Sequence, residues 1–189
     1  GIADQSMIFV VGGGPSLIGF DWSRLRGQRV IAVNAAYADI PWAEALVFAD
    51  ARFYEWNHKR PEWAAFEGRR ITTWRRAPAG VERRSNSPYQ PLSRDLKALA
   101  GKCSGAKALN LAYQTGCKTI YLLGYDMQAN GNYHDRHVLG ARQGRYPEFV
   151  ASLTAMIKVI QASGVTVINA CPHSGVTIAP RIPLTELPV

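Results

Sequence analysis

The sequence predicts one α/β domain in which helices cover both faces of a mostly parallel β-sheet. Short apolar runs rich in β-forming residues alternate with helical segments of about ten residues, which is the pattern of right-handed βαβ units. The chain of 189 residues is long enough to bury a substantial core and too short for two full domains. We therefore treat it as a single Rossmann-like domain.

The first strand is expected at residues 7–11, because the apolar run Met-Ile-Phe-Val-Val stops abruptly at Gly-Gly-Gly-Pro. Ser16 then opens a short helical or turn segment. Further strands are expected at residues 29–33, 45–48, 70–74, 119–123 and 165–169. Helices are expected at residues 50–64, 104–115 and 147–162, the last two ended by glycines.

Residues 77–95 are rich in proline, serine and arginine, and we interpret them as a mobile loop or lid. The domain itself is assigned to residues 7–180. Residues 1–6 precede Met7 and are interpreted as left over from an expression vector. Residues 181–189 follow as an extended C-terminal tail whose contacts the sequence does not identify.

Basic residues are concentrated in the middle of a chain whose net charge is +8. This stretch should attract anions, although a solvated basic face is an equally good explanation. We do not expect a nucleic-acid partner, because no aromatic stacking motif accompanies the charges. The residues concerned are Arg52, Lys59, Arg60, Arg69, Arg70, Arg75, Arg76, Arg83, Arg84, Arg94, Lys97 and Lys102.

Two classes of protein are excluded by composition. No apolar run approaches the roughly 18 residues that a membrane span needs. The cysteines, Cys103, Cys117 and Cys171, show no CxxC spacing that would indicate zinc or a redox pair. A reduced, cytoplasmic compartment fits this pattern best.

Ligands of open parallel sheets bind outside the carboxyl ends of the strands, so the residues that follow each strand are the candidates for a site. The turn Gly12-Gly13-Gly14-Pro15-Ser16 would let backbone N–H groups approach a phosphate or ribose, with Ser16 adding a hydroxyl. It is neither a dinucleotide fingerprint nor a P-loop, because Leu17 replaces the third glycine and no Gly-Lys-Ser/Thr follows. A purely structural tight turn is equally compatible with it.

Asn34 and Asp50 follow the second and third strands. Their side chains could bind the base, the ribose or a phosphate-bound metal of a nucleotide, or they could cap helices. After the strand at 119–123, the segment Asn-Tyr-His-Asp-Arg-His contains His134 and His137 beside Asp135. Such a histidine could act as a general base. A metal site that includes Asp126, or a solvated loop, are the alternatives.

Several of these motifs, taken in order, resemble the bacterial sialyltransferases of glycosyltransferase family forty-two. They are Gly-Gly-Gly-Pro-Ser-Leu, Ala-Val-Asn, Ser-Gly, Tyr-Leu-Leu-Gly-Tyr-Asp and Cys-Pro-His-Ser. The chain also looks like the related domains of flagellar motility accessory factors and archaeal hydroxymethylpterin diphosphokinases. The resemblance covers residues 7 to about 180, and its motifs are short.

The resemblance to the sialyltransferases implies a nucleotide donor site. The residues that it assigns to this site are Gly13, Gly14, Pro15, Ser16, Asn34, Asp50, Ser104, Gly105, Asp126, Cys171, Pro172, His173 and Ser174. Asp50 and His173 stand where the family has asparagines. It also implies a catalytic histidine, for which His134 is slightly preferred to His137, and a phosphate-supporting tyrosine at Tyr133 or, less closely matched, Tyr146.

The implied activity is transfer of a nucleotide-activated sugar, such as a CMP-linked acidic sugar, to a glycan or small-molecule acceptor. The reaction would be a direct displacement with a histidine base, and no metal or other cofactor is obligatory. One alternative is a magnesium-dependent diphosphokinase of the hydroxymethylpterin type, with Asp50 and Asp126 facing the metal. The other is a binding or assembly protein that keeps the fold without catalysis.

Overall fold

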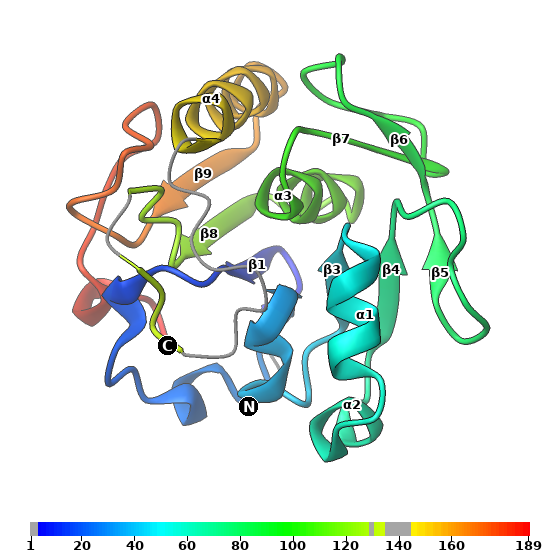
Figure 1. The fold of residues 1–189 in the computed structure, drawn as a ribbon. Helices are drawn as coiled ribbons and strands as arrows, with labels where there is room; N and C mark the ends of the chain where they lie inside the picture. Colours follow the sequence, from blue (N-terminus) through cyan, green and yellow to red (C-terminus); the bar gives the residue numbers. More distant parts are fainter. Residues whose placement is uncertain (1–3, 129–130, 135–144) are drawn as a thin grey trace.

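A computed structural model of the chain describes residues 4–128, 131–134 and 145–189. Its centre is a seven-stranded parallel sheet in the order β5-β4-β3-β2-β1-β8-β9 (Figure 1). The strands are β1 (Met7–Val11), β2 (Val30–Val33), β3 (Ala45–Phe48), β4 (Arg69–Thr72), β5 (Glu82–Arg83), β8 (Thr119–Leu123) and β9 (Thr166–Asn169). The predicted α/β fold class is confirmed.

The central strands are apolar because both faces of the sheet are covered. All four residues of β2 and of β3 are buried. Within β1, alternate side chains join different cores: Ile8 and Val10 pack in one, and Phe9 and Val11 in the other. The chain thus has two apolar layers separated by one sheet.

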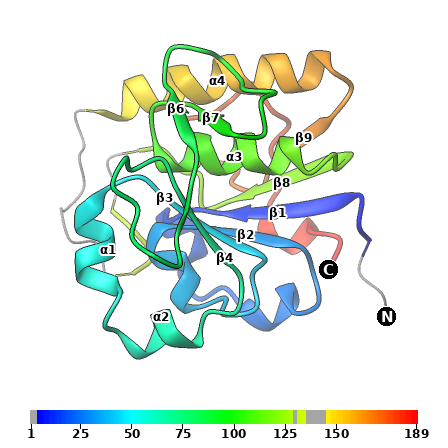
Figure 2. The same cartoon turned by 90° about the vertical axis from the view of Figure 1, so that its right-hand side faces the viewer.

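The two layers are covered differently. Helices α3 (Ser104–Gln114) and α4 (Tyr146–Ala162) lie on one face, above the sheet in Figure 2. The opposite face is covered by short elements, α2 (Pro61–Ala65), η1 (Pro15–Leu17), η2 (Trp22–Leu25) and η3 (Asn34–Ala38), together with the C-terminal residues. None of the helices in the described part of the chain is long and apolar enough to cross a membrane.

The single helix predicted at residues 50–64 was wrong. The structure has two helices there, α1 (Ala51–Asn57) and α2, separated by residues 58–60. Pro61 is the physical reason, because it lacks an N–H and is favoured at the first position of a new helix. The buried side chain of Asn57 accepts a hydrogen bond from the Tyr37 hydroxyl at 2.7 Å and fixes the end of α1.

Residues 77–95 are more ordered than predicted. They contain β5 and β6 (Ser85–Ser87), and β6 pairs with β7 (Ala98–Ala100), a strand that we did not predict. The buried side chain of Asn110 on α3 accepts hydrogen bonds from Ser93 N at 2.9 Å and Ala100 N at 3.0 Å. This segment is therefore attached to α3 at one side of the molecule (Figure 1).

The C-terminal residues pack on the face of the sheet opposite α3 and α4. The Ile182 amide donates to the Asn169 carbonyl at 3.0 Å, beside an isolated bridge between Asn169 and Arg181, and η5 (Leu184–Glu186) follows. Leu187 is buried in the same layer. At the other end of the chain, residues 1–3 lie outside the described residues, and the Ser6 carbonyl accepts bonds from two amides at the start of β8.

Candidate functional site

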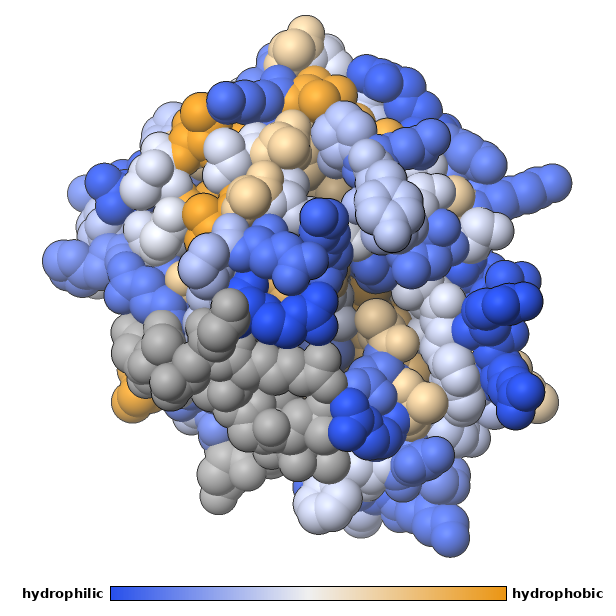
Figure 3. Space-filling model, turned by 45° about the horizontal axis from the view of Figure 1, so that its top comes forward, coloured by the Kyte–Doolittle hydropathy of each residue, from blue (hydrophilic) through white to orange (hydrophobic). Residues whose placement is uncertain are grey.

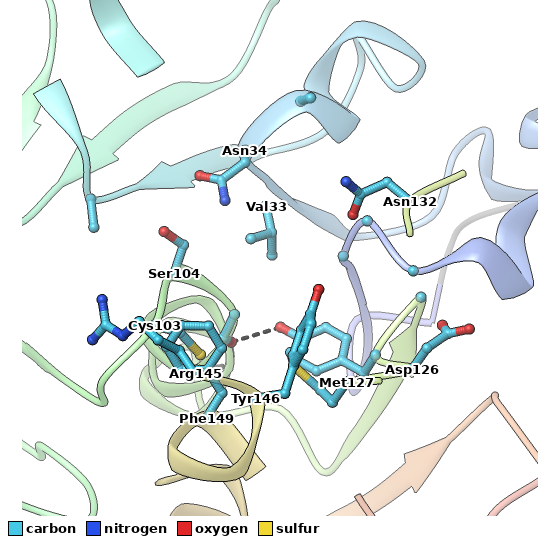
Figure 4. Close-up of a pocket in the computed structure, with 18 of the residues that line it drawn as sticks. Val33, Asn34, Cys103, Ser104, Asp126, Met127, Asn132, Arg145, Tyr146 and Phe149 are labelled. Atoms are coloured by element: carbon cyan, nitrogen blue, oxygen red, sulfur yellow. Dashed lines mark hydrogen bonds between the residues drawn. The ribbon is translucent and has the colours of Figure 1, made fainter. Parts of the chain in front are cut away.

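A cavity of about 520 Å³ lies at the carboxyl ends of β1, β2, β3 and β8. Figure 4 shows Asn34, Ser104 and Asn132 around the same open space, with Tyr146 and Phe149 contributed by the start of α4. The sequence-predicted residues that line this first cavity are Gly13, Gly14, Asn34, Asp50, Ser104, Gly105, Asp126, His134 and Tyr146. The cavity therefore lies where the sequence predicted a site, outside the carboxyl ends of the parallel strands.

The glycine turn after β1 is held against the end of β8. Gly12 N donates to the Leu123 carbonyl at 2.7 Å and Gly14 N to the Gly124 carbonyl at 2.8 Å. A Cβ atom on Gly14 would lie 2.0 Å from Oδ1 of Asp126. Glycine is required here because a carboxylate occupies the space that a side chain would need.

Asp126 organises this turn. Its buried carboxylate accepts hydrogen bonds from the Ser16 amide at 2.9 Å and from the Ser16 hydroxyl at 2.6 Å. The hydroxyl that we predicted to serve a ligand is therefore bonded within the protein. Neither Ser16 nor Pro15 is among the described residues that line the first cavity.

Two strand-end residues form another wall of the first cavity. Asn34 adopts a left-handed backbone conformation with φ of 50°, which asparagine tolerates better than most residues, and it begins η3. Asp50 caps α1 by accepting from Arg52 N at 2.9 Å, and it forms an ion pair with the Arg52 guanidinium at 3.2 Å. Asp50 is therefore a helix cap, one of its two predicted roles, and it also lines the first cavity.

The N-terminus of α3 forms a third wall, through Ser104 and Gly105. Amide groups in the first turn of a helix have no partner within the helix and carry a partial positive charge. Gly105 is closely packed, since its carbonyl accepts from the Tyr125 hydroxyl at 2.7 Å. The ammonium of Lys107, one turn further along, donates to the Gly101 carbonyl at 2.5 Å, and burial lowers its pKa.

The charge of the first cavity differs from the charge of the basic stretch. Of the twelve basic residues in that stretch, all of them described, only Lys102 lines the cavity. Arg145 is a second cation that lines the cavity. Glu148 forms an ion pair with Lys102 at 3.9 Å and with Arg145 at 3.5 Å. Hydrophilic residues cover much of the face drawn in Figure 3, with smaller hydrophobic patches between them. Some arginines are structural: Arg70 stacks on Trp63 and hydrogen-bonds to its carbonyl.

His134 lies over the glycine turn. A Cβ atom on Gly13 would be 3.3 Å from the His134 Nε2 and 3.4 Å from the Asn132 Oδ1. The preceding residue is fixed to the turn as well, because Tyr133 N donates to the Gly13 carbonyl at 3.0 Å. The other candidate base, His137, and its neighbour Asp135 lie outside the described residues.

The two candidate tyrosines occupy different places. The Tyr133 hydroxyl donates to Oδ2 of Asp39 at 2.8 Å, and Tyr133 is not among the described residues that line the first cavity. Tyr146 does line it, and burial, with a smaller effect from the charge of Asp126, raises the pKa of its hydroxyl. Of the two candidate tyrosines, Tyr146 is therefore the one that the structure places at the first cavity.

The Cys171–Ser174 segment contacts residues that line the first cavity without lining it itself. None of its four residues is among the described residues that line the first cavity. The Ser174 hydroxyl donates to the Tyr125 carbonyl at 2.5 Å, and the His173 carbonyl accepts from Gln128 Nε2 at 2.5 Å. The segment therefore supports residues 125–128, and burial raises the pKa of the Cys171 thiol.

Sequence reasoning missed several residues of the cavity. The described residues concerned are Phe53, Lys102, Cys103, Met127, Gln128, Asn132, Arg145 and Phe149. Asn132 lies in the histidine segment and could have been found there. Arg145 and Phe149 come from the start of a helix far along the chain, and no local pattern connects them with the glycine turn. Within residues 4–128, 131–134 and 145–189, no group of three metal-ligating side chains comes together.

No protein-family model matches this chain, and no curated protein matches it. Solved structures do. A structure described as the sialyltransferase CST-II with a trisaccharide acceptor and CMP has a TM-score of 0.59 at 15% identity, covering 93% of this chain and 85% of that one. The sialyltransferase CstII from Campylobacter jejuni in complex with a substrate analogue, cytidine-5'-monophosphate, has a TM-score of 0.55 at 15% identity, covering 93% of this chain and 84% of that one.

An alpha-2,3-sialyltransferase from Campylobacter jejuni in apo form is similarly close. Its TM-score is 0.53 at 17% identity, with 95% of this chain and 80% of that chain covered. At these identities the similarity concerns the fold. The chain therefore has a sialyltransferase-like fold over nearly its whole length, as the sequence motifs predicted.

Proposed function

We propose that this protein is a glycosyltransferase that takes its sugar from a nucleotide-activated donor, and that the donor is a CMP-linked acidic sugar. The observation that carries the proposal is the first cavity. It combines a glycine turn free of side chains, the polar residue Asn34 and the N-terminus of α3 at one end of the sheet. Its volume of about 520 Å³ is in the range of small-molecule sites.

Each wall suits one part of the donor. The N-terminus of α3, with Lys102 and Arg145 nearby, suits the phosphate because amide groups and cations stabilise negative charge. Asn34 and Asp50 lie across the cavity and suit the base and the ribose hydroxyls. A carboxylate at Asp50 disfavours the phosphate on that side, so the two ends of the donor are distinguished.

The proposed chemistry is a direct displacement. An acceptor hydroxyl oxygen forms a bond to the anomeric carbon as the bond from that carbon to the phosphate oxygen breaks. The electron pair of the broken bond leaves with CMP, and His134 takes the hydroxyl proton as general base. Tyr146 is protonated at neutral pH, and burial raises the pKa of its hydroxyl further, so it can donate a hydrogen bond to the leaving phosphate.

The contacts of Asp50 and Asp126 do not favour the magnesium-dependent diphosphokinase. That reaction would require Asp50 and Asp126 to face a metal. Asp126 instead accepts two hydrogen bonds from Ser16, and Asp50 caps α1 and pairs with Arg52. The proposed transfer uses neither carboxylate as a metal ligand.

Calorimetric titration with nucleotides tests the proposal. We expect CMP to bind more tightly than UMP, AMP or GMP, and the affinity to be unchanged by EDTA. Asn34→Ala should weaken CMP binding about tenfold or more, because the proposed hydrogen bond from its side chain to the nucleotide is lost. The matched control is Asn86→Ala, since Asn86 is exposed on β6 and does not line the first cavity.

The contrary outcomes are distinct. Binding of nucleoside triphosphates that requires magnesium would replace the proposal by the diphosphokinase. Absence of binding by any nucleotide would replace it by a binding or assembly protein that retains the fold.

A further inference from the structure

His134 and Asn132 line two cavities. Besides the first cavity, they border an open second cavity of about 660 Å³. Its other walls come from Asp39, Tyr133 and five residues that follow the glycine turn, namely Leu17, Ile18, Gly19, Phe20 and Trp22. A single histidine therefore stands between the proposed donor site and a neighbouring space that the donor site does not use.

Aromatic rings form a continuous row beside the second cavity. Phe20 contacts Trp22 edge-on with ring centroids 5.1 Å apart, Trp22 contacts Tyr133 at 5.3 Å, and Tyr133 contacts His134 at 4.8 Å. Ile18, which also lines this cavity, is 70% exposed. The apolar face of a sugar ring can stack on such rings while its hydroxyls remain hydrogen-bonded, which suits amphipathic aromatic side chains.

The charges of the two cavities are different. The first cavity is lined by charges of both signs, Lys102 and Arg145 as well as Asp50 and Asp126, and by the N-terminus of α3. Among the described residues that line the second, Asp39 is the one acidic or basic side chain apart from His134. A carboxylate accepts hydrogen bonds from hydroxyl groups and repels a carboxylate or phosphate on a ligand.

We propose that the second cavity is the acceptor site and that it takes a neutral, hydroxyl-rich sugar stacked on Trp22 and Tyr133. This inference rests on the proposed transferase function. The geometry follows from the position of His134: a hydroxyl entering from the second cavity meets the imidazole before it meets the donor. Asp39 has a positioning role, since it holds the Tyr133 hydroxyl and selects against anionic acceptors.

Fluorine NMR of protein labelled with 5-fluorotryptophan tests the site without requiring activity. The chain has five tryptophans, and Trp22→Phe and Trp56→Phe identify two of the signals. The probes are methyl glycosides of glucose, galactose and N-acetylglucosamine, added to protein saturated with CMP. Methyl glucuronide is the matched anionic probe, because it differs from the methyl glucoside by a carboxylate in place of a hydroxymethyl group.

We expect at least one neutral glycoside to shift the Trp22 signal and leave Trp56 unchanged, since Trp56 is exposed on α1 and lines neither cavity. The glucuronide should bind about tenfold more weakly, and Asp39→Asn should remove that difference. Trp22→Ala should abolish glycoside binding while CMP affinity stays within about twofold of the unaltered protein, with Trp56→Ala as the control.

Three results would overturn the inference. They are no shift of Trp22 with any neutral glycoside, displacement of CMP by a glycoside, or tighter binding of the glucuronide than of the glucoside. These results are separate from failure of the proposed function, which would appear as an absence of CMP binding in the preceding titration.

Discussion

Gly14 and Asp126 lie far apart in the sequence and determine each other's surroundings. The carboxylate of Asp126 occupies the position of a side chain on Gly14 and is fixed there by two hydrogen bonds from Ser16. The turn can therefore present its backbone to a ligand only if residue 14 has no Cβ. At the scale of single residues, the site depends on this one close contact.

Gly14→Ala should destabilise the protein and abolish CMP binding. A methyl group 2.0 Å from the Asp126 carboxylate forces the turn to move, and we expect a loss of about 2–4 kcal/mol in the free energy of unfolding. Urea denaturation and CMP titration measure the two effects. Gly13→Ala is the matched control: its nearest contact is 3.3 Å, so its effect on stability should be clearly smaller. Equal losses in both variants would contradict this explanation.

His134→Gln should slow sugar transfer by about 10²–10⁴-fold, the usual range for removal of a general base. CMP affinity should change by less than about twofold, because the base acts on the acceptor proton and not on the nucleotide. Transfer rates with a CMP-linked sugar provide the measurement. His58→Gln is the control, since His58 stacks on Tyr54 and lines neither cavity. Full activity of His134→Gln would exclude this histidine as the base.

At the scale of elements, the short strands at the side of the sheet depend on individual side chains more than on their own length. β6 and β7 have three residues each, and Asn110 on α3 joins the end of β7 to Ser93. Its amide nitrogen also donates to the Ser93 carbonyl at 3.0 Å. One buried side chain thereby satisfies three backbone groups.

Asn110→Ala should lower the free energy of unfolding by about 2–4 kcal/mol, because buried backbone donors lose their partners and a cavity forms. Urea denaturation provides the measurement. Asn86→Ala, at an exposed position of β6, should change stability by less than about 0.5 kcal/mol. A loss at Asn110 no greater than that at Asn86 would show that β7 is held by other contacts.

β5 is attached to the sheet by an ion pair between Glu82 and Arg69 at 2.7 Å. The hydrogen bond from Arg69 holds the pKa of Glu82 below its ordinary value of 4.5. A lowered carboxyl pKa stabilises the folded state above pH 4.5, and this contribution is lost as the pH falls below that value. Because both side chains are exposed by about half, the contribution should be no more than about 1 kcal/mol.

Glu82→Gln should therefore reduce stability slightly at pH 7, and by less at pH 3. Urea denaturation of both proteins at the two pH values measures the difference. A difference that grew toward acidic pH would have the wrong sign and would contradict the assigned role of the pair.

At the scale of the whole molecule, one face of the sheet is closed by two long helices and the other by short elements from both ends of the chain. The C-terminal residues belong to the second face, where the Arg24 guanidinium donates to the carbonyls of Leu184 and Val189 at 3.2 Å and 3.3 Å. Leu187 is 5% exposed there. The C-terminal tail is therefore packed against the core through Leu187.

Leu187→Ala should lower the free energy of unfolding by about 2–3 kcal/mol through loss of buried apolar surface. Denaturation should remain a single transition, and the dependence of the unfolding free energy on urea concentration should be unchanged, because the apolar layer that contains Leu187 unfolds together with the sheet. Leu96→Ala is the matched control, since Leu96 is 65% exposed. A separate early transition in Leu187→Ala would show instead that the tail detaches independently.

The sequence alone determined the parallel sheet and the end of it that carries the site. Buried strands must be apolar throughout, and each apolar run stops where the chain leaves the sheet. The ranges predicted for β1, β3 and β8 match the observed ones for this reason. Gly13, Gly14, Asn34, Asp50 and Asp126 could be placed at one edge because parallel strands all end there.

Only the tertiary structure decided which polar groups face the cavity and which are bonded within the protein. Ser16 bonds to Asp126, 110 positions away, and Tyr133 bonds to Asp39, 94 positions away. Such pairs leave no local signature, because a hydrogen bond depends on distance in space and not on spacing along the chain. For the same reason the second cavity, on the other side of His134, could be recognised only in the folded molecule.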